Sequence, residues 1–374
     1  MKLSTCDSLT NISAESWNAL TDTDNPFIQH DFLLALEQNE CLHTYGWHPN
    51  YLLIKDNEKL IAAAPAYIKT NSYGEFVFDW SWADAYKQAG KQYYPKMVIA
   101  IPFTPANTKK YLIHPDYSAQ KDALIQQLTE FSIYVCQQHK LSSLHNLFID
   151  KDITEKQTQL GLFQRIDCQY HWHNNNYNDF DEFLSTLKPK KRKNIKQERK
   201  KVRSSEINIK RVNGDDLTES EWLRLYDFYR ITFMKKSGSP TLTLEFFKAI
   251  KHKLLAIIAF HNDEMVAGAI CIIGKTTLYG RHWGCFEDYD SLHFEVCYYQ
   301  GIEYCIENRL SLFEPGAQGE HKISRGFLPT LTCSSHWVED EQFRQLIKAH
   351  CQRETEYMLH HFKEMQEKSP YKND

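Results

Sequence analysis

The densest group of reactive side chains in the sequence lies in the glycine-rich segment 313–326. Its three glycines and one proline leave backbone amides free to contact a ligand. Within six residues, Glu320 and His321 offer proton acceptors, and Lys322 and Arg325 offer cations. The two cations are spaced so that both could face one phosphate or carboxylate, which arginine binds through two parallel hydrogen bonds. This pattern favours a binding or catalytic loop over a surface loop with solvated charges.

A second group lies just upstream, on a predicted strand at 276–285 and a predicted helix at 292–309. Polar and aromatic side chains occur on several faces of this helix, so some of them must face a polar cavity. Transfer of an acyl group to an amine needs a base for the amine proton and donors for the tetrahedral oxyanion. Alternatively, His293 and Glu295 only form hydrogen bonds within the start of the helix. The residues predicted for this site are, as catalytic groups, Tyr279, His293, Glu295, Glu320 and His321 and, as substrate-binding groups, Arg281, Tyr298, Gln318, Lys322 and Arg325.

The elements that must position these residues occur in a similar order in both halves of the chain. In the first half we predict helices at 14–20, 27–38, 119–139 and 154–160 and strands at 51–55, 60–67, 75–79, 97–101, 143–148 and 164–173. In the second half we predict helices at 179–187, 219–234, 244–254, 292–309 and 339–368 and strands at 207–212, 255–261, 265–274, 276–285 and 310–314. This order is typical of an α/β (α+β) fold with tandem GNAT-like acyltransferase domains, each a mixed, mainly antiparallel sheet flanked by helices. The polar run Asn174–Asn178 predicts domains at 1–173 and 174–374.

The turn at 286–290 lacks the residues that bind coenzyme A in ordinary GNAT enzymes. Those enzymes hold the pyrophosphate at a Gln/Arg-x-x-Gly-x-Gly/Ala turn and the following helix N-terminus. Here the turn contains Glu287, Asp288 and Asp290, and three carboxylates repel a pyrophosphate. The sequence therefore predicts that coenzyme A does not bind this turn in the usual way.

The first half has its own unusual segment at 73–83, where aromatic side chains alternate with Glu75 and Asp79. Aromatic and carboxylate surfaces suit a sugar-like or peptide-like ligand. We therefore predict that Glu75 and Asp79 bind substrate. The alternative is an aromatic core strand with exposed carboxylates.

A basic stretch at 188–203 contains ten lysine or arginine residues in sixteen positions. Such a helix could contact RNA phosphates, although the usual interpretation of a charge run is a solvated helix face. His171 and His173 resemble a pair of metal ligands but have no acidic partner nearby, so we expect no metal.

The bulk composition fits a globular protein with 42% hydrophobic and 25% charged residues. A length of 374 residues favours two domains, and a net charge of −4 gives no general attraction to nucleic acid. The ten cysteines include no Cys-x-x-Cys pair, which favours reduced thiols. No apolar run resembles a signal peptide or a membrane span, so we expect a cytoplasmic protein without membrane insertion.

The sequence resembles the FemAB-like group of N-acyltransferases, a GNAT-related family, in short pieces along nearly the whole chain. These pieces are Asn25–Phe27, Ala35–Glu37, Gly74–Asp79, Tyr94–Lys96, Pro102–Pro105, Lys191–Lys193, Glu198–Arg199, Tyr279–Gly284, Leu292–Gln300, Gly316–Lys322 and Arg325–Phe327. The resemblance implies tandem GNAT-like domains and a role in peptidoglycan biosynthesis or recognition. The FemABX relatives transfer an amino acid from aminoacyl-tRNA to the amine of a cell-wall precursor peptide and need no metal.

The same resemblance implies roles for two features of this chain. The relatives hold precursor phosphates with a lysine beyond the last strand of the sheet, a place that Lys322 occupies here. Some relatives insert a long coiled-coil arm in the second domain, and this chain lacks it. The basic helix at 188–203 is then the candidate substitute for tRNA contact.

Three hypotheses fit these residues. The first is a metal-independent transferase that forms an amide on an amine-bearing small molecule or peptide, with aminoacyl-tRNA or acyl-CoA as donor and no firmly implied cofactor. In it, Glu295 or Glu320 accepts the amine proton, and Lys322 with Arg325 anchors an anionic part of the substrate. The second is an acyl-CoA-dependent N-acetyltransferase that holds coenzyme A in an unusual pose. The third is a non-catalytic protein that binds cell-wall fragments.

Overall fold

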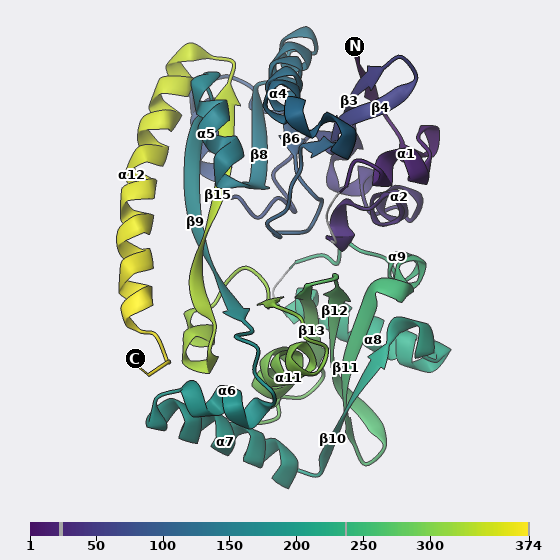
Figure 1. The fold of residues 1–374 in the computed structure, drawn as a ribbon, viewed down its shortest axis with the longest axis vertical. Helices are drawn as coiled ribbons and strands as arrows, with labels where there is room; N and C mark the ends of the chain where they lie inside the picture. Colours follow the sequence, from purple (N-terminus) through teal and green to yellow (C-terminus); the bar gives the residue numbers. More distant parts are fainter. Residues whose placement is uncertain (22–24, 236–237, 373–374) are drawn as a thin grey trace. The chain divides into compact units, whose positions relative to one another are not determined.

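The computed structural model describes residues 1–21, 25–235 and 238–372 (Figure 1). Packing divides the chain into two compact units. Unit 1 contains Met1–Asp167 and Leu331–His360, and unit 2 contains Cys168–Thr330 and His361–Asp374. The domains predicted at 1–173 and 174–374 divide the chain only once, and they stay a prediction.

Unit 1 contains two sheets and their flanking helices. The first sheet has the order β1-β3-β4-β7, and the second runs β15-β8-β6-β5-β2 with β6 and β8 parallel. The strands of the two sheets of unit 1 are β1 (Lys2–Cys6), β2 (Trp47–Pro49), β3 (Tyr51–Asp56), β4 (Lys59–Ala64), β5 (Ala66–Lys69), β6 (Lys96–Ile99), β7 (Leu112–Ile113), β8 (Ser143–Ile149) and β15 (Leu328–Val338). Its helices are α1 (Ala14–Asn18), α2 (His30–Gln38), α3 (Trp80–Gln88), α4 (Lys121–Gln138), α5 (Lys151–Gln159) and most of α12 (Glu341–Glu367).

Unit 2 contains one sheet with the order β10-β11-β12-β13-β14-β9. Neighbouring strands are antiparallel except β13 and β14, which are parallel. Its strands are β9 (Phe163–His173), β10 (Ile207–Asn213), β11 (Leu254–His261), β12 (Glu264–Ile273), β13 (Thr277–Cys285) and β14 (Leu312–Glu314). Its helices are α6 (Phe180–Thr186), α7 (Pro189–Ser204), α8 (Glu219–Lys235), α9 (Leu244–Ala249), α10 (Leu292–Phe294), the π-helical turn Glu295–Tyr299 and α11 (Gln300–Glu307).

Helix α8 covers one face of the unit 2 sheet at very short range (Figure 1). Its apolar side chains recur every three to four residues, which places them on one side of the helix. Gly284 makes the close approach feasible, because a Cβ atom there would lie 1.9 Å from the carbonyl oxygen of Phe228. The helix at 292–307 packs on the opposite face of β13.

Each unit completes its sheet with a strand from the other half of the sequence. In unit 1, β15 pairs antiparallel with β8, although 179 residues separate Ile149 from Leu328 along the chain. In unit 2, Trp172 and His173 of β9 pair with β14. This exchange of terminal strands explains why packing does not divide the chain at one point.

Most predicted elements are present within two or three residues of their predicted ends, including α4, β9 and the hairpin of β11 and β12. The predicted strand at 75–79 is wrong, because that segment is an irregular loop. Strands β1 and β15 and helix α3 were not predicted. In the loop, Glu75 and Asp79 point inward to a buried lysine, so the alternation of side chains does not reflect a strand.

Candidate functional site

The site begins where the parallel strands β13 and β14 of unit 2 diverge. They pair as far as Tyr279 and Glu314, where β14 ends, whereas β13 continues to Cys285. At this point the chain passes close to Gly280, whose missing Cβ atom would lie 3.3 Å from Cα of Pro315. The glycine-rich segment predicted as a site therefore leaves the sheet beside the free part of β13.

Two glycines shape the segment that follows. A short 3-10 helix, η8 (Glu320–Arg325), is bounded by Gly319 with φ +116° and Gly326 with φ +103°. Side chains other than glycine are strained at such angles. The tight helix places Lys322 and Arg325 inward and leaves Glu320 and His321 exposed.

Lys322 is buried but makes few hydrogen bonds. Its side chain is 2% exposed, and Nζ donates to the carbonyl oxygen of Gly316 at 2.7 Å. No other acceptor for Nζ occurs in residues 1–21, 25–235 and 238–372, so two of its three donors have no protein partner. Burial lowers the pKa of Lys322 to about 8, against the opposing effect of Cys297. A ligand carboxylate or phosphate would supply the missing acceptors.

Arg325 is fully engaged by protein groups. Its guanidinium donates to both carboxylate oxygens of Glu198, at 2.7 and 3.2 Å, and to the carbonyl oxygen of His321 at 2.9 Å. The same group lies over the ring of Phe294, 3.4 Å from its centroid. These contacts tie η8 to helix α7 and to the helix at 292–307, and the predicted role of Arg325 in substrate binding stays a prediction.

His293, Tyr298 and His321 form one cluster beside Lys322. The hydroxyl of Tyr298 and Nε2 of His321 are 2.8 Å apart, and the rings of His293 and Tyr298 have centroids 5.4 Å apart. Burial lowers the pKa of His321, and the nearby Arg325 and Lys322 lower it further. The imidazole is therefore neutral near pH 7, the form that accepts a proton.

Glu295 lies in a π-helical turn and takes part in a buried ion pair. The turn Glu295–Tyr299 interrupts an otherwise α-helical stretch, a feature that is frequent at functional sites. The carboxylate accepts hydrogen bonds from Arg199 at 3.1 and 3.2 Å and from Gln300 at 2.8 Å. These partners fit a role in holding the turn in place, and the predicted role as a base stays a prediction.

Tyr279 and Arg281 lie two residues apart on β13, and a β-bulge at Arg281 shifts the register with β12 between them. Burial, and secondly Glu314, raises the pKa of Tyr279. Burial lowers the pKa of Arg281 to about 10, although the carboxylate of Glu314 opposes the change. The charge of Glu314, at the point where β13 and β14 diverge, therefore raises the pKa of both Tyr279 and Arg281.

Comparison with known proteins identifies the family. A family profile described as peptidoglycan biosynthesis/recognition matches residues 8–373. The chain belongs to the FemAB-like family. No curated protein matches its sequence.

Solved structures with the same fold are distant in sequence. The FemAB-like chain aligns with the structure of FemX at a TM-score of 0.56 and 10% identity, over 93% of this chain and 100% of that one. L-PGS from Bacillus licheniformis aligns at a TM-score of 0.52 and 8% identity, over 89% of this chain and 98% of that one. The C-terminal domain of a putative lysylphosphatidylglycerol synthetase from Agrobacterium fabrum aligns at a TM-score of 0.52 and 8% identity, over 90% of this chain and 95% of that one. The predicted family and the predicted α/β fold class are confirmed.

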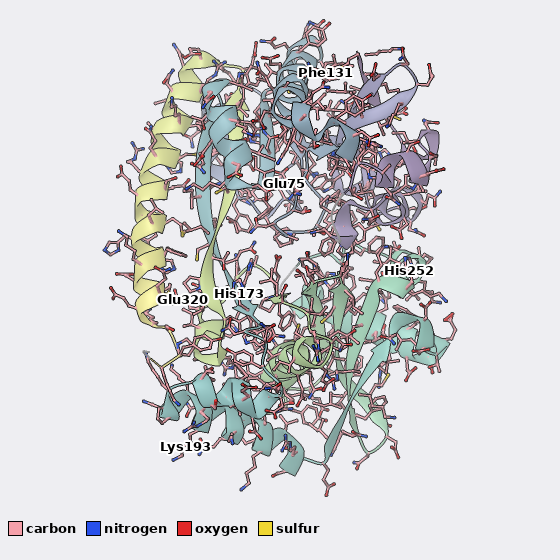
Figure 2. The ribbon with its side chains drawn as sticks, viewed as in Figure 1. Glu75, Phe131, His173, Lys193, His252 and Glu320 are labelled. Atoms are coloured by element: carbon pink, nitrogen blue, oxygen red, sulfur yellow. The ribbon has the colours of Figure 1, made fainter. Side chains whose placement is uncertain are left out.

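Several predicted site residues lie outside the cluster formed by His293, Tyr298 and His321 beside Lys322. Glu320 is exposed and lies 3.9 Å from His361 and 3.6 Å from Lys368 (Figure 2). Gln318 is also exposed. Glu75 and Asp79 belong to unit 1, where both contact Lys96. The roles assigned to all of these residues stay predictions.

Sequence reasoning missed Glu198 and Arg199 as residues that support the site. These neighbours on α7 hold Arg325 and Glu295, respectively. A signal was present, because Glu198 is the only acidic residue in the basic stretch at 188–203. An isolated acid among ten cations predicts a specific partner, but it does not identify which one.

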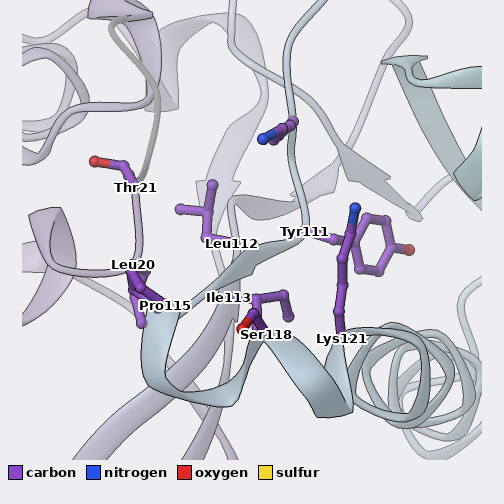
Figure 3. Close-up of a pocket in the computed structure, with 9 residues that line it drawn as sticks. Leu20, Thr21, Tyr111, Leu112, Ile113, Pro115, Ser118 and Lys121 are labelled. Atoms are coloured by element: carbon purple, nitrogen blue, oxygen red, sulfur yellow. The ribbon is translucent and has the colours of Figure 1, made fainter.

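Other concave or ligand-like features lie apart from this cluster. In unit 1, a pocket of about 240 Å³ lies beside Tyr111 and Lys121 (Figure 3). Over the described ranges, the structure brings no three His, Cys, Asp or Glu side chains together as a metal site, and His171 hydrogen-bonds to Gln169. Among the helices described, none is both long and apolar enough to cross a membrane.

Proposed function

We propose that this FemAB-like protein is an acyltransferase or aminoacyltransferase that forms an amide bond on an amine acceptor in unit 2. The observation that carries the proposal is Lys322, a buried ammonium with two unused donors beside the neutral pair of His321 and Tyr298. An anion site next to a proton acceptor, at the divergence of two parallel strands, suits a substrate with both a negative group and an amine. Family membership and the acyltransferase fold support the proposal.

The reaction is nucleophilic substitution at an activated ester. The acceptor nitrogen attacks the carbonyl carbon of the donor, which forms the C–N bond and a tetrahedral oxyanion. The ester C–O bond then breaks, and the leaving oxygen takes up a proton. The proton lost from the amine goes to the imidazole of His321, with Tyr298 as its hydrogen-bond partner. Breaking the ester supplies the driving force.

The geometry supports the following substrate contacts as part of the proposal. Lys322 binds a carboxylate or phosphate of the acceptor, in keeping with a cell-wall peptide precursor. Tyr279, the last residue of β13 that pairs with β14, and Arg281 beyond it contact the acyl group or its carbonyl oxygen. Glu295 and Arg325 hold the catalytic segment in place, and Glu320 is the alternative base because its carboxylate is exposed.

The donor is better matched by aminoacyl-tRNA than by acyl-CoA. The turn after β13 contains three carboxylates, of which Asp290 pairs with Lys201 at 2.8 Å. These carboxylates repel the negative charge of a coenzyme A pyrophosphate. An ester-linked donor whose phosphates bind elsewhere avoids the conflict.

The exposed side of α7 is the proposed contact for tRNA phosphates. Lys190, Lys193, Lys200 and Arg203 are exposed and have no ion-pair partner among the described residues. Figure 2 labels Lys193 on this helix. The inner side buries Ile195 and Val202, so the helix has no apolar face free to enter a membrane. Releasing about four counterions makes RNA affinity fall roughly a hundredfold between 50 and 200 mM salt.

A transfer assay tests the proposal. The purified protein is incubated with a muropeptide and either aminoacyl-tRNA or acetyl-CoA, and mass spectrometry detects the new amide. We expect product with aminoacyl-tRNA, at least about tenfold less with His321→Gln, and unchanged product with the exposed control Lys87→Met. Product with acetyl-CoA alone would support the acetyltransferase hypothesis instead. Muropeptide binding without any product would support a non-catalytic binding protein.

A further inference from the structure

The pocket beside Tyr111 and Lys121 in unit 1 lies between the chain after α1, strand β7 and the start of α4 (Figure 3). Its volume of about 240 Å³ suits a ligand smaller than a typical drug molecule. The hydroxyl of Tyr111 donates to the side chain of Asn146 at 2.9 Å and accepts from Gln157 at 2.6 Å, so the ring serves as a wall. The rest of the apolar wall is formed by Leu20, Leu112, Ile113 and Pro115. The pocket therefore suits a small ligand with an apolar part.

The polar lining of the same pocket is positively charged. Lys109 and Lys121 supply two ammonium groups, and none of the lining residues that the structure describes is acidic. The hydroxyl of Thr21 already donates to the carbonyl oxygen of Asn18 at 2.8 Å. In contrast, the side chains of Ser118 and Lys121 are exposed and make no hydrogen bond or ion pair with any described residue. A ligand with a negative group would give both of them a partner.

The acidic residues that flank Lys121 in the sequence pair with other lysines. Asp116 forms an ion pair with Lys59 at 2.7 Å, and Asp122 forms one with Lys156. Each of these two carboxylates thus has a cation of its own, which reduces its attraction for Lys121. The positive charge at the pocket is therefore left for an anion from solution.

Lys121 also has an unfavourable position in its own helix. It is the first residue of α4, which has 18 residues, and Gln120 before it makes no capping hydrogen bond with its side chain. The amino end of a helix carries a partial positive charge, so a lysine at this end does not stabilise the helix. Residues that break such a local rule are expected at functional sites. The lysine and the helix end together make the potential at the pocket positive.

We propose that this pocket of unit 1 binds a small organic carboxylate with an aliphatic chain. The carboxylate contacts Lys121 and the hydroxyl of Ser118, and the chain packs against Leu112 and Ile113. An inorganic phosphate would leave the apolar wall uncovered, and a neutral alcohol would leave the ammonium of Lys121 unpaired. Coenzyme A is too large for a pocket of this volume. The site belongs to unit 1, and it does not depend on transfer by unit 2.

Calorimetric titration of the full-length protein tests the proposal. The probes are octanoate, 1-octanol with the same chain but no charge, and inorganic phosphate with a charge but no chain. We expect octanoate to bind at least about tenfold more tightly than either of the other two probes. Lys121→Met should weaken octanoate binding about tenfold, whereas Lys121→Arg should keep it. The control Lys87→Met removes an exposed lysine from α3 and leaves octanoate affinity unchanged.

Two further variants separate this pocket from the proposed anion site of unit 2. Lys322→Met is expected to lose transfer but to keep octanoate affinity, so failure of the proposed reaction leaves the pocket standing. Ser118→Phe places a ring in the pocket at an exposed position, and it should abolish octanoate binding without unfolding the protein. The proposal is overturned if octanoate does not bind, or if octanol or phosphate binds as tightly. It is also overturned if Lys121→Met keeps octanoate affinity, or if Lys322→Met loses it.

Discussion

The two units contain similar junctions of parallel strands, and a buried lysine at each is used differently. In unit 1, β6 and β8 pair as far as Ile99 and Asn146, and Lys110 donates to three carbonyl oxygens at 2.6 to 3.3 Å. In unit 2, β13 and β14 pair as far as Tyr279 and Glu314, and Lys322 donates to one carbonyl oxygen. All three N–H donors of Lys110 thus have protein acceptors, whereas only one donor of Lys322 does within the described ranges.

This difference separates a lysine whose donors are satisfied by the protein from one whose donors are only partly satisfied. Burying an ammonium is tolerated when its three donors find acceptors, and Lys110 meets that condition within the protein. Lys322 has one protein acceptor among the described residues, and burial lowers its pKa to about 8. The same residue type at similar junctions is thus saturated by protein acceptors in unit 1, whereas in unit 2 we propose that it binds the substrate anion.

The largest expected effect is loss of stability in Lys110→Met. The substitution removes the lysine hydrogen bonds to three carbonyl oxygens, of which that of Phe148 still accepts from the backbone N–H of Thr108. We expect the free energy of unfolding to fall by about 3 kcal/mol. Urea unfolding measures this change, with the exposed Lys87→Met as control. Equal stability of Lys110→Met and Lys87→Met would remove the distinction between the two junctions.

Lys322→Met is expected to show the opposite pattern. Transfer should fall about a hundredfold, equivalent to about 2.7 kcal/mol, because the anionic part of the acceptor loses its cation. Stability should change by less than about 1 kcal/mol, since the variant removes a poorly solvated charge that has one protein acceptor. Steady-state kinetics and urea unfolding of the same preparation measure both effects. A variant that unfolds readily but transfers normally would assign Lys322 to the structure.

The pH dependence of binding sharpens the comparison further. Because the pKa of Lys322 is lowered to about 8, affinity for an anionic acceptor should fall about tenfold per pH unit above pH 8. Lys322→Arg should move this decline to higher pH. Between about pH 8 and 10.5 the unfolded chain binds more protons at this lysine, so its contribution to stability should rise with pH. Affinity that is constant from pH 7 to 10 would contradict the binding role.

The smallest effect is expected from glycine substitutions with matched strain. Gly319→Ala and Gly161→Ala both place alanine at positive φ, at a cost of about 1 to 2 kcal/mol each. Only at position 319 would the new Cβ meet the ring of His321, at 2.6 Å. Gly319→Ala should therefore also reduce transfer about tenfold, as measured by kcat/KM, whereas equal kinetics in both variants would separate the loop from catalysis.

The sequence predicted regular elements well where one local period dominated. The hairpin of β11 and β12 and the helix α4 follow directly from hydrophobic spacing. Alternation failed at 75–79, because two buried lysines from β5 and β6 hold that segment as a loop. Strand β15 was missed because its partner β8 lies 179 residues away, and no local pattern reports such a pairing.

For the candidate site, the sequence by itself determined the family and the segment that carries the reactive residues. Residue types and glycine positions are local properties, so 313–326 could be identified without a structure. Only the tertiary structure decided how each group is used. It pairs Arg325 with Glu198 and Glu295 with Arg199, and leaves Lys322 with two unused donors. These differences depend on hydrogen-bond partners from distant parts of the chain, which spacing along the sequence does not encode.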